Sequence, residues 1–284
     1  MRLLNTTTLQ LREFIGEAPA LDFPKYAILS HTWGPDELTF SDLNHIDQAK
    51  SKAGYSKVEQ CCKIACNDGL EWAWVDTCCI NKDSSAELSE AINSMFKWYQ
   101  AATVCYAHLE DTEWQNDSLP TTHIWDLCPQ RIPRWFGRGW TLQELIAPLN
   151  VVFYSRTWSR LGTKTSMCSA ISHVTGIPID VLNHTTPPSS VPVPIRISWT
   201  SRRVTTRRED MAYCLLGIFD INMPLLYGEG EKAFRRLQEE ILRTTDDHGV
   251  FLGNLAPEPT PLEVDRNLSC TRQAFTIRRN KSIQ

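Results

Sequence analysis

The chain has 284 residues, of which 42% are hydrophobic and 22% are charged, and its net charge is −4 at pH 7. This composition is typical of a soluble globular protein that buries a sizeable core, and the acidic balance argues against a nucleic-acid partner, whose binding surface would be basic. No apolar run approaches the roughly 18 residues that span a membrane, and the first residues lack the apolar core of an export signal, so we expect a cytoplasmic protein with no membrane span.

The first half of the chain alternates short apolar runs with amphipathic segments. Apolar runs bounded by turn residues predict strands at residues 26–30, 72–76, 103–109 and 151–155. Between them, apolar residues at helical spacing predict helices at residues 57–68, 84–100 and 140–147. The second helix opens with Ser84 and Glu87, the pattern of a capping box. This alternation predicts an α/β fold of three layers, a parallel sheet flanked by helices on both faces.

Beyond residue 160 the pattern changes. A proline-rich connector at residues 185–194 is followed by two predicted helices, at 209–219 and 229–245. These helices are expected to form a C-terminal helical annex packed on the sheet domain. The sequence therefore predicts a lead-in (1–23), an α/β domain (24–160), the annex (161–250) and a loose or truncated end (251–284).

Ligands of parallel sheets bind beyond the carboxyl ends of the strands. The stretches "SHTWG" and "DTCCINKD" follow two predicted strands. They place Ser30, His31, Trp33 and Gly34 near Asp76 at that edge of the sheet. Residue chemistry alone favours a simpler role for Asp76, as the cap of the turn that follows it. The glycine-rich phosphate loops of Rossmann and P-loop proteins are absent from the sequence.

The ten cysteines form no CxxC pair and no Cys/His cluster with zinc spacing, so we predict no metal site. In a reducing compartment such cysteines usually act as small buried hydrophobes, which is the favoured interpretation here. A nucleophilic pair of Cys78 or Cys79 with His31 is the alternative. It is less favoured because no third residue is evident to orient the histidine.

The stretch "RWFGRGWTLQELIAP" places Trp140 one helical turn before Glu144, so the two side chains share a face of the predicted helix. A carboxyl group held against an indole among apolar neighbours has a raised pKa. It also suits a transition state with a cation-like sugar ring, as in the cleavage of a glycosidic bond. The alternative is a surface ion pair between Glu144 and Arg138, and residue chemistry alone favours that alternative.

A second basic stretch, "TSRRVTTRRED" at residues 200–210, lies in the annex. Arginines bind phosphate through a planar fork, which makes this stretch a candidate phosphate site. The favoured interpretation is a solvated helix entry whose arginines pair with Glu209 and Asp210.

Three stretches, "YAILSHTWG", "DGLEWAWVDTCCINKDSSAELSEAINSMFKWYQAATVCYAHLED" and "RWFGRGWTLQELIAPLNVVFYS", together resemble the heterokaryon incompatibility (HET) domain of filamentous fungi. The later "REDMAYCLLGIFDINMPLLYGEGEKAFRRLQEEI" resembles the segment that commonly follows that domain. The resemblance implies an effector of fungal innate immunity, whose activation kills the fused cell after non-self recognition. It also implies a sensor or incompatibility partner that supplies the signal.

HET domains in turn resemble Toll/interleukin-1 receptor (TIR) domains, with a strand ending in serine, a later strand ending in aspartate and a W-x-x-x-E-L helix. Here these are Ser30, Asp76 and "WTLQEL". The resemblance implies a TIR/flavodoxin-like fold in which Glu144 is the catalytic residue that cleaves NAD at the nicotinamide–ribose bond. It therefore reverses the preference for a surface ion pair.

On this resemblance NAD is a substrate, no cofactor is required, and self-association into a homo-oligomer completes the site. The residues expected to line the substrate site are Ser30, His31, Trp33, Gly34, Asp76, Cys78, Arg138 and Trp140. The competing function is a non-enzymatic adaptor that acts through self-association and recruits partners.

Overall fold

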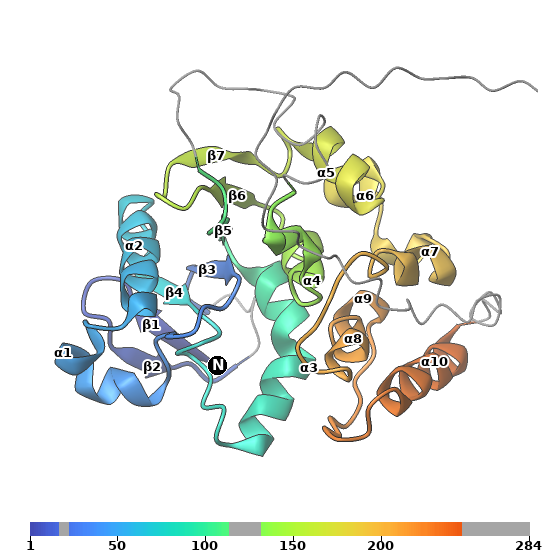
Figure 1. Ribbon diagram of the computed structural model, residues 1–284, viewed down its shortest axis with the longest axis horizontal. Helices are drawn as coiled ribbons and strands as arrows, with labels where there is room; N and C mark the ends of the chain where they lie inside the picture. The colour runs from blue at the N-terminus through green and yellow to red at the C-terminus, as the bar shows by residue number, and fades with distance from the viewer. Residues whose placement is uncertain (17–22, 114–131, 246–284) are drawn as a thin grey trace, which may run out of the picture.

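The computed structural model describes residues 1–16, 23–113 and 132–245 (Figure 1). Within these ranges seven strands form one sheet in the order β2-β1-β4-β3-β5-β6-β7. The strands are β1 (Arg2–Asn5), β2 (Leu11–Glu13), β3 (Tyr26–His31), β4 (Trp72–Trp74), β5 (Val104–His108), β6 (Val151–Tyr154) and β7 (Arg160–Thr163). The C-terminal segment predicted over 251–284 lies outside the described residues.

Short 3-10 turns and α-helices make up the remaining elements. Those that precede β7 are η1 (Ser41–His45), α1 (Ile46–Ala49), α2 (Ala53–Asn67), α3 (Ser85–Ala101), η3 (Arg134–Gly137) and α4 (Thr141–Ile146). Those that follow β7 are α5 (Cys168–Thr175), α6 (Ile179–Leu182), η4 (Pro188–Ser190), α7 (Val193–Ser198), α8 (Asp210–Tyr213), α9 (Leu216–Phe219) and α10 (Lys232–Thr244).

The centre of the sheet is parallel, with β4, β3, β5 and β6 as neighbours. All six residues of β3 are buried, as expected for a strand that is covered on both faces. The α/β class is therefore confirmed, but the prediction of a wholly parallel sheet is wrong at the edges. β1 pairs antiparallel with β2, and β6 with β7, because short connections reverse the chain whereas a parallel pair needs a long crossover. β1 also pairs antiparallel with β4.

The predicted lead-in over residues 1–23 contributes β1 and β2, and β1 pairs with β4. Neither strand was predicted; they are four and three residues long. The sheet also continues past the predicted boundary at residue 160, through β7.

Helix α2 covers one face of the sheet, and α3 and α4 cover the other (Figure 1). From β3 the chain continues to β4 on one side and then returns past β3 to β5 on the other side. Because both crossovers are right-handed, the connecting helices α2 and α3 lie on opposite faces of the sheet. The direction of the connections reverses between β3 and β5. In open α/β sheets this reversal leaves a crevice at the carboxyl ends of the two strands, where ligands bind.

Helix α3 begins as its sequence pattern predicts, with one difference. The Glu87 backbone N–H donates to Ser84 Oγ at 3.3 Å, which is the first half of the capping box. The Glu87 carboxylate does not return to Ser84: it accepts from the Asn81 backbone N–H at 2.8 Å and pairs with Arg2 of β1. The cap therefore also ties α3 to the N-terminal edge of the sheet.

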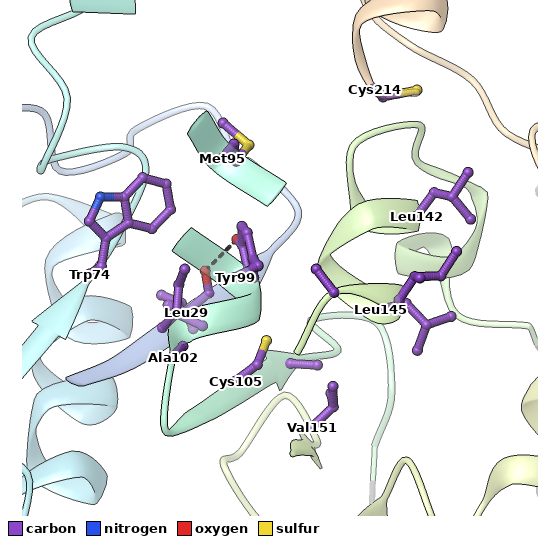
Figure 2. Packing of buried hydrophobic residues seen from close by; sticks show 14 of the residues in the cluster. Leu29, Trp74, Met95, Tyr99, Ala102, Cys105, Leu142, Leu145, Val151 and Cys214 are labelled. Atoms are coloured by element: carbon purple, nitrogen blue, oxygen red, sulfur yellow. Dashed lines mark hydrogen bonds between the residues drawn. The ribbon is translucent and has the colours of Figure 1, made fainter. Parts of the chain in front are cut away.

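The annex continues the hydrophobic core on the α3 and α4 side. Figure 2 shows Leu142 and Leu145 on α4, with Cys105 and Val151 of the sheet below the helix and Cys214 of the annex above it, and all five residues belong to one buried core. The helix predicted over 209–219 is two helices, α8 and α9.

The second of these helices packs directly on α3. A Cβ atom added to Gly217 would lie 2.0 Å from the Phe96 Cβ atom. A glycine is therefore required where α9 crosses α3. Among the residues that the structure describes, no helix is long and apolar enough to cross a membrane.

Candidate functional site

Glu144 lies on α4, a six-residue helix in which every residue is buried. Its exposed fraction is only 7%, although it carries a carboxyl group. The hydroxyl of Ser30, near the carboxyl end of β3, donates to Glu144 Oε2. The same hydroxyl accepts from Trp135 Nε1 at 2.8 Å. Trp135, Ser30 and Glu144 therefore form a buried chain of two hydrogen bonds at the end of β3, beside the point where the connections reverse between β3 and β5.

Burial raises the pKa of Glu144 to about 8, and the nearby charge of Asp76 acts in the same direction. The hydrogen bond from Ser30 and the positive charge of Arg203 oppose this rise. Tyr99 of α3 is also a hydrogen-bond partner of the carboxyl, but its hydroxyl donates to the Leu29 carbonyl at 3.1 Å (Figure 2).

The hydrogen bond with Tyr99 also lowers the Glu144 pKa, as the one from Ser30 does. Burial and the Asp76 charge therefore account for the whole of the net rise.

The indole beside this group is not the one that the sequence analysis placed there. Trp140 immediately precedes α4, and its side chain lies against Asp210 of the annex. Trp135 takes the expected place because the turn η3 directs its ring toward β3. No periodicity in the sequence links Trp135 to Glu144, since η3 and α4 are separate elements.

A second polar cluster lies at the carboxyl ends of β3 and β4. His31 Nε2 lies 3.1 Å from Asp76 Oδ1, and Trp33 Nε1 donates to Asp76 Oδ2 at 2.9 Å. The Lys82 ammonium lies 3.6 Å from the centre of the Trp33 ring. Although burial opposes ionisation of Asp76, the Lys82 charge and the hydrogen bonds from His31 and Trp33 lower its pKa to about 2.

The sheet separates these two groups. Successive side chains of a strand point to opposite faces, so Ser30 faces α3 and α4 whereas His31 faces α2. On the α2 side, His31 Nδ1 lies 3.9 Å from Glu37 Oε1, and that carboxylate pairs with Lys57 at 2.6 Å. Of the predicted site, the structure therefore brings Ser30 to Glu144 and groups His31 with Trp33 and Asp76 across the strand end.

The remaining predicted residues have separate partners. The Gly34 backbone N–H donates to the Glu37 carboxylate at 2.6 Å. A hydrogen bond with Cys79 and burial raise the pKa of the Cys78 thiol, so this cysteine is not poised as a nucleophile. Arg138 donates to Thr206 Oγ1 at 3.2 Å. Since Glu144 is buried, the interpretation of a surface ion pair between Arg138 and Glu144 is wrong.

The arrangement contains two carboxyl groups whose environments drive their pKa values apart, to about 8 for Glu144 and about 2 for Asp76. At neutral pH the first is protonated and the second is ionised. Such divergence is typical of acid–base sites and also occurs in structural networks. Within the described part of the chain, no three His, Cys, Asp or Glu side chains gather where they could hold a metal ion.

Comparison with known proteins places the first half of the chain in one family. The family model described as "Heterokaryon incompatibility protein (HET)" matches residues 26–134, and this match ends before Trp135 and Glu144. "Vegetative incompatibility protein HET-E-1" of Podospora anserina is 49% identical over 228 residues, which cover 79% of this chain and 17% of that protein. The chain thus spans less than one fifth of the length of this relative. No solved structure matches.

Proposed function

Because this chain is a heterokaryon incompatibility (HET) domain protein, we propose that it is an effector that triggers programmed cell death on non-self recognition. The support is the 49% identity to a relative that is named for vegetative incompatibility. The effector acts in the cytoplasm and receives its signal from an incompatibility partner or sensor. Its active form is a homo-oligomer.

The proposed chemical step is hydrolysis of NAD at the nicotinamide–ribose bond. The bond between ribose C1′ and the ring nitrogen breaks, and nicotinamide leaves as a neutral molecule with the electron pair. The oxygen of water bonds to C1′, a proton is released, and ADP-ribose is formed. The positive charge of the ring passes to the ribose in the transition state, so an adjacent carboxylate lowers the barrier.

The observation that carries this proposal is the position of Glu144. It is a buried carboxyl at the reversal point of the sheet, with Ser30 and Trp135 as hydrogen-bonded neighbours. Ligands of α/β sheets bind at such points, and the W-x-x-x-E-L helix is the feature shared with TIR domains.

Activation must change the ionisation of this carboxyl. In the enclosed form Glu144 is protonated at neutral pH, and a protonated acid does not stabilise a cation. The nicotinamide ring is cationic, and an opposite charge within a few ångströms lowers the pKa of a carboxyl group. We propose that self-association opens the site, and that bound NAD then favours the ionised form.

The enclosure of Glu144 supports a second candidate, a non-enzymatic adaptor. Only 7% of this residue is exposed, and its carboxyl has protein partners from β3 and α3. In an adaptor, Glu144 would stabilise the packing of α4 on the sheet, and the surface of the domain would recruit partners.

Purified chain incubated with NAD separates the two candidates. Nicotinamide and ADP-ribose are quantified by chromatography for the wild type, for Glu144→Gln and for the matched control Glu110→Gln, whose side chain is 43% exposed. Each protein is tested dilute, and at high concentration with a crowding agent. We expect equimolar products from the wild type and the control at high concentration, and none from Glu144→Gln. A wild type that is inert in every condition but kills cells when expressed would contradict NAD hydrolysis and support the adaptor.

A further inference from the structure

A segment of the annex runs directly alongside the chain that leads into α4. The Val204 backbone N–H donates to the Gly137 carbonyl at 2.7 Å, and the Gly139 N–H donates to the Val204 carbonyl at 3.0 Å. A Cβ atom added to Gly139 would lie 2.4 Å from Thr205 Cγ2. The Thr205 side chain therefore occupies the space that a Cβ atom at Gly139 would need, and a larger residue there would force it to shift.

Next to these two backbone hydrogen bonds, the guanidinium of Arg203 is inserted into the core, and the residue is only 4% exposed. Its Nε donates to the Trp199 carbonyl at 3.2 Å within the annex. Its Nη1 donates to the Arg138 carbonyl at 2.8 Å and to Thr141 Oγ1 at 2.9 Å. Arg203 and Arg138 are 65 positions apart in the chain, so the annex reaches back to the first turn of α4.

The contact at Thr141 continues to the Glu144 carboxyl through hydrogen bonds. The Thr141 hydroxyl donates to the Trp135 carbonyl at 2.5 Å. The Trp135 indole donates to Ser30, and Ser30 donates to Glu144. Thr141 also lies three residues before Glu144, on the same side of the helix. Arg203 is therefore connected to Glu144 both along α4 and through Trp135.

Arg203 is also the cation whose positive charge opposes the rise in the Glu144 pKa that burial causes. The other groups that act on this carboxyl are Ser30 of β3, Tyr99 of α3 and Asp76 after β4, of which only Asp76 carries a charge and raises the Glu144 pKa. Burial lowers the pKa of Arg203 to about 10, so the guanidinium stays charged through the physiological range. Its Nη2 is buried and has no hydrogen-bond partner among the described residues.

We infer that Arg203 is a positioning residue for Glu144: the annex holds its guanidinium against the start of α4, where it orients the helix and supplies positive charge to the site. The annex is then part of the functional unit, although the HET family match ends at residue 134. The functional meaning of this inference rests on the proposed role of Glu144 in NAD cleavage, but the coupling of the two residues does not.

Titration of the Glu144 carboxyl measures this coupling without any activity assay. The full chain is labelled with ¹³C-glutamate, and the Glu144 carboxyl resonance is assigned by its loss in Glu144→Gln. The variants are Arg203→Met, Arg203→Lys and the matched control Arg202→Met, whose side chain is exposed. We expect Arg203→Met to raise the midpoint by about one pH unit, because an opposing charge is removed. Arg203→Lys should shift it less, and Arg202→Met should leave it unchanged.

Melting curves identify variants that fail to fold. If Arg203→Met does not fold, Arg203→Gln replaces it, since its amide retains a donor for the Arg138 carbonyl. A folded neutral variant whose Glu144 midpoint equals that of the wild type would overturn the inference. If the Arg203 variants shift the Glu144 midpoint but the wild type does not hydrolyse NAD, the proposed reaction is contradicted and the coupling is not. If the wild type hydrolyses NAD but the folded neutral variant has the same Glu144 midpoint, only the coupling of Arg203 to Glu144 is contradicted.

Discussion

The buried carboxyl of Glu144 predicts an unusual pH dependence of stability. Its pKa is raised from the ordinary value of 4.5 to about 8 in the folded chain. A carboxyl with a raised folded-state pKa stabilises the fold fully below its unfolded pKa, and this contribution is lost as the pH rises toward the folded value. The window of loss therefore runs from pH 4.5 to about pH 8.

Substitution of Glu144 by glutamine removes this titration and keeps the shape of the side chain. At about 1.4 kcal/mol for each pH unit, the wild type should lose on the order of 3 kcal/mol relative to Glu144→Gln between pH 4.5 and pH 7. The stability of Glu144→Gln relative to the wild type should therefore rise steadily toward pH 8. Contributions from histidines and other carboxyl groups are common to both proteins and cancel in the difference.

Urea unfolding at pH 5, 6, 7 and 8, followed by tryptophan fluorescence, gives this difference directly. Glu110→Gln serves as the control, because its half-exposed side chain should leave the pH profile parallel to that of the wild type. Parallel profiles for wild type and Glu144→Gln would refute the reasoning. They would mean that the carboxyl ionises in the folded chain as it does in water, and that the enclosed group of Ser30, Trp135 and Glu144 does not persist in solution.

Three further predictions concern the contacts around the site. Asp76→Asn should lower the free energy of unfolding at pH 7 by on the order of 2 kcal/mol. Because the folded pKa of Asp76 is lowered to about 2, this stabilisation is present above pH 3.8 and is lost as the pH falls to about 2, so urea unfolding should show the deficit shrinking in acid. Gly139→Ala should cost about 1–3 kcal/mol in thermal melting, because its Cβ would overlap Thr205. Gly137→Ala is its control, since the nearest atom there is 4.0 Å away, and equal melting of the two variants would contradict the close approach of the annex. Trp135→Phe should cost about 1–3 kcal/mol, because the buried Ser30 hydroxyl loses its indole donor. An unchanged melting curve for Trp135→Phe would show that this hydrogen bond is not formed in solution.

Local patterns in the sequence were enough to predict the central layer of the fold. Continuous apolar runs predicted β3 and β5 to within one residue at each end, since strands covered on both faces contain few polar side chains. The start of α3 was predicted from Ser84, whose hydroxyl accepts from Glu87 within a single turn. Both signals depend on residues that are near one another in the chain.

Features that depend on distant contacts were not predicted. β1 is short, and it forms a strand because its backbone pairs with that of β4 at residues 72 and 73. The predicted helix at 209–219 breaks into two, and Gly217 of the second packs against Phe96. A local pattern contains no information on which remote surface a segment will meet.

The sequence by itself determined the alternation of strands and helices, and it placed Ser30 and Glu144 as candidates for one site. Only the tertiary structure decided that Trp135, rather than Trp140, donates to Ser30, and that Arg203 of the annex lies against the start of α4. The physical reason is that burial and charge act through space. The ionisation of Glu144 depends on groups from β3, α3 and the annex, which are brought together only when the whole chain packs.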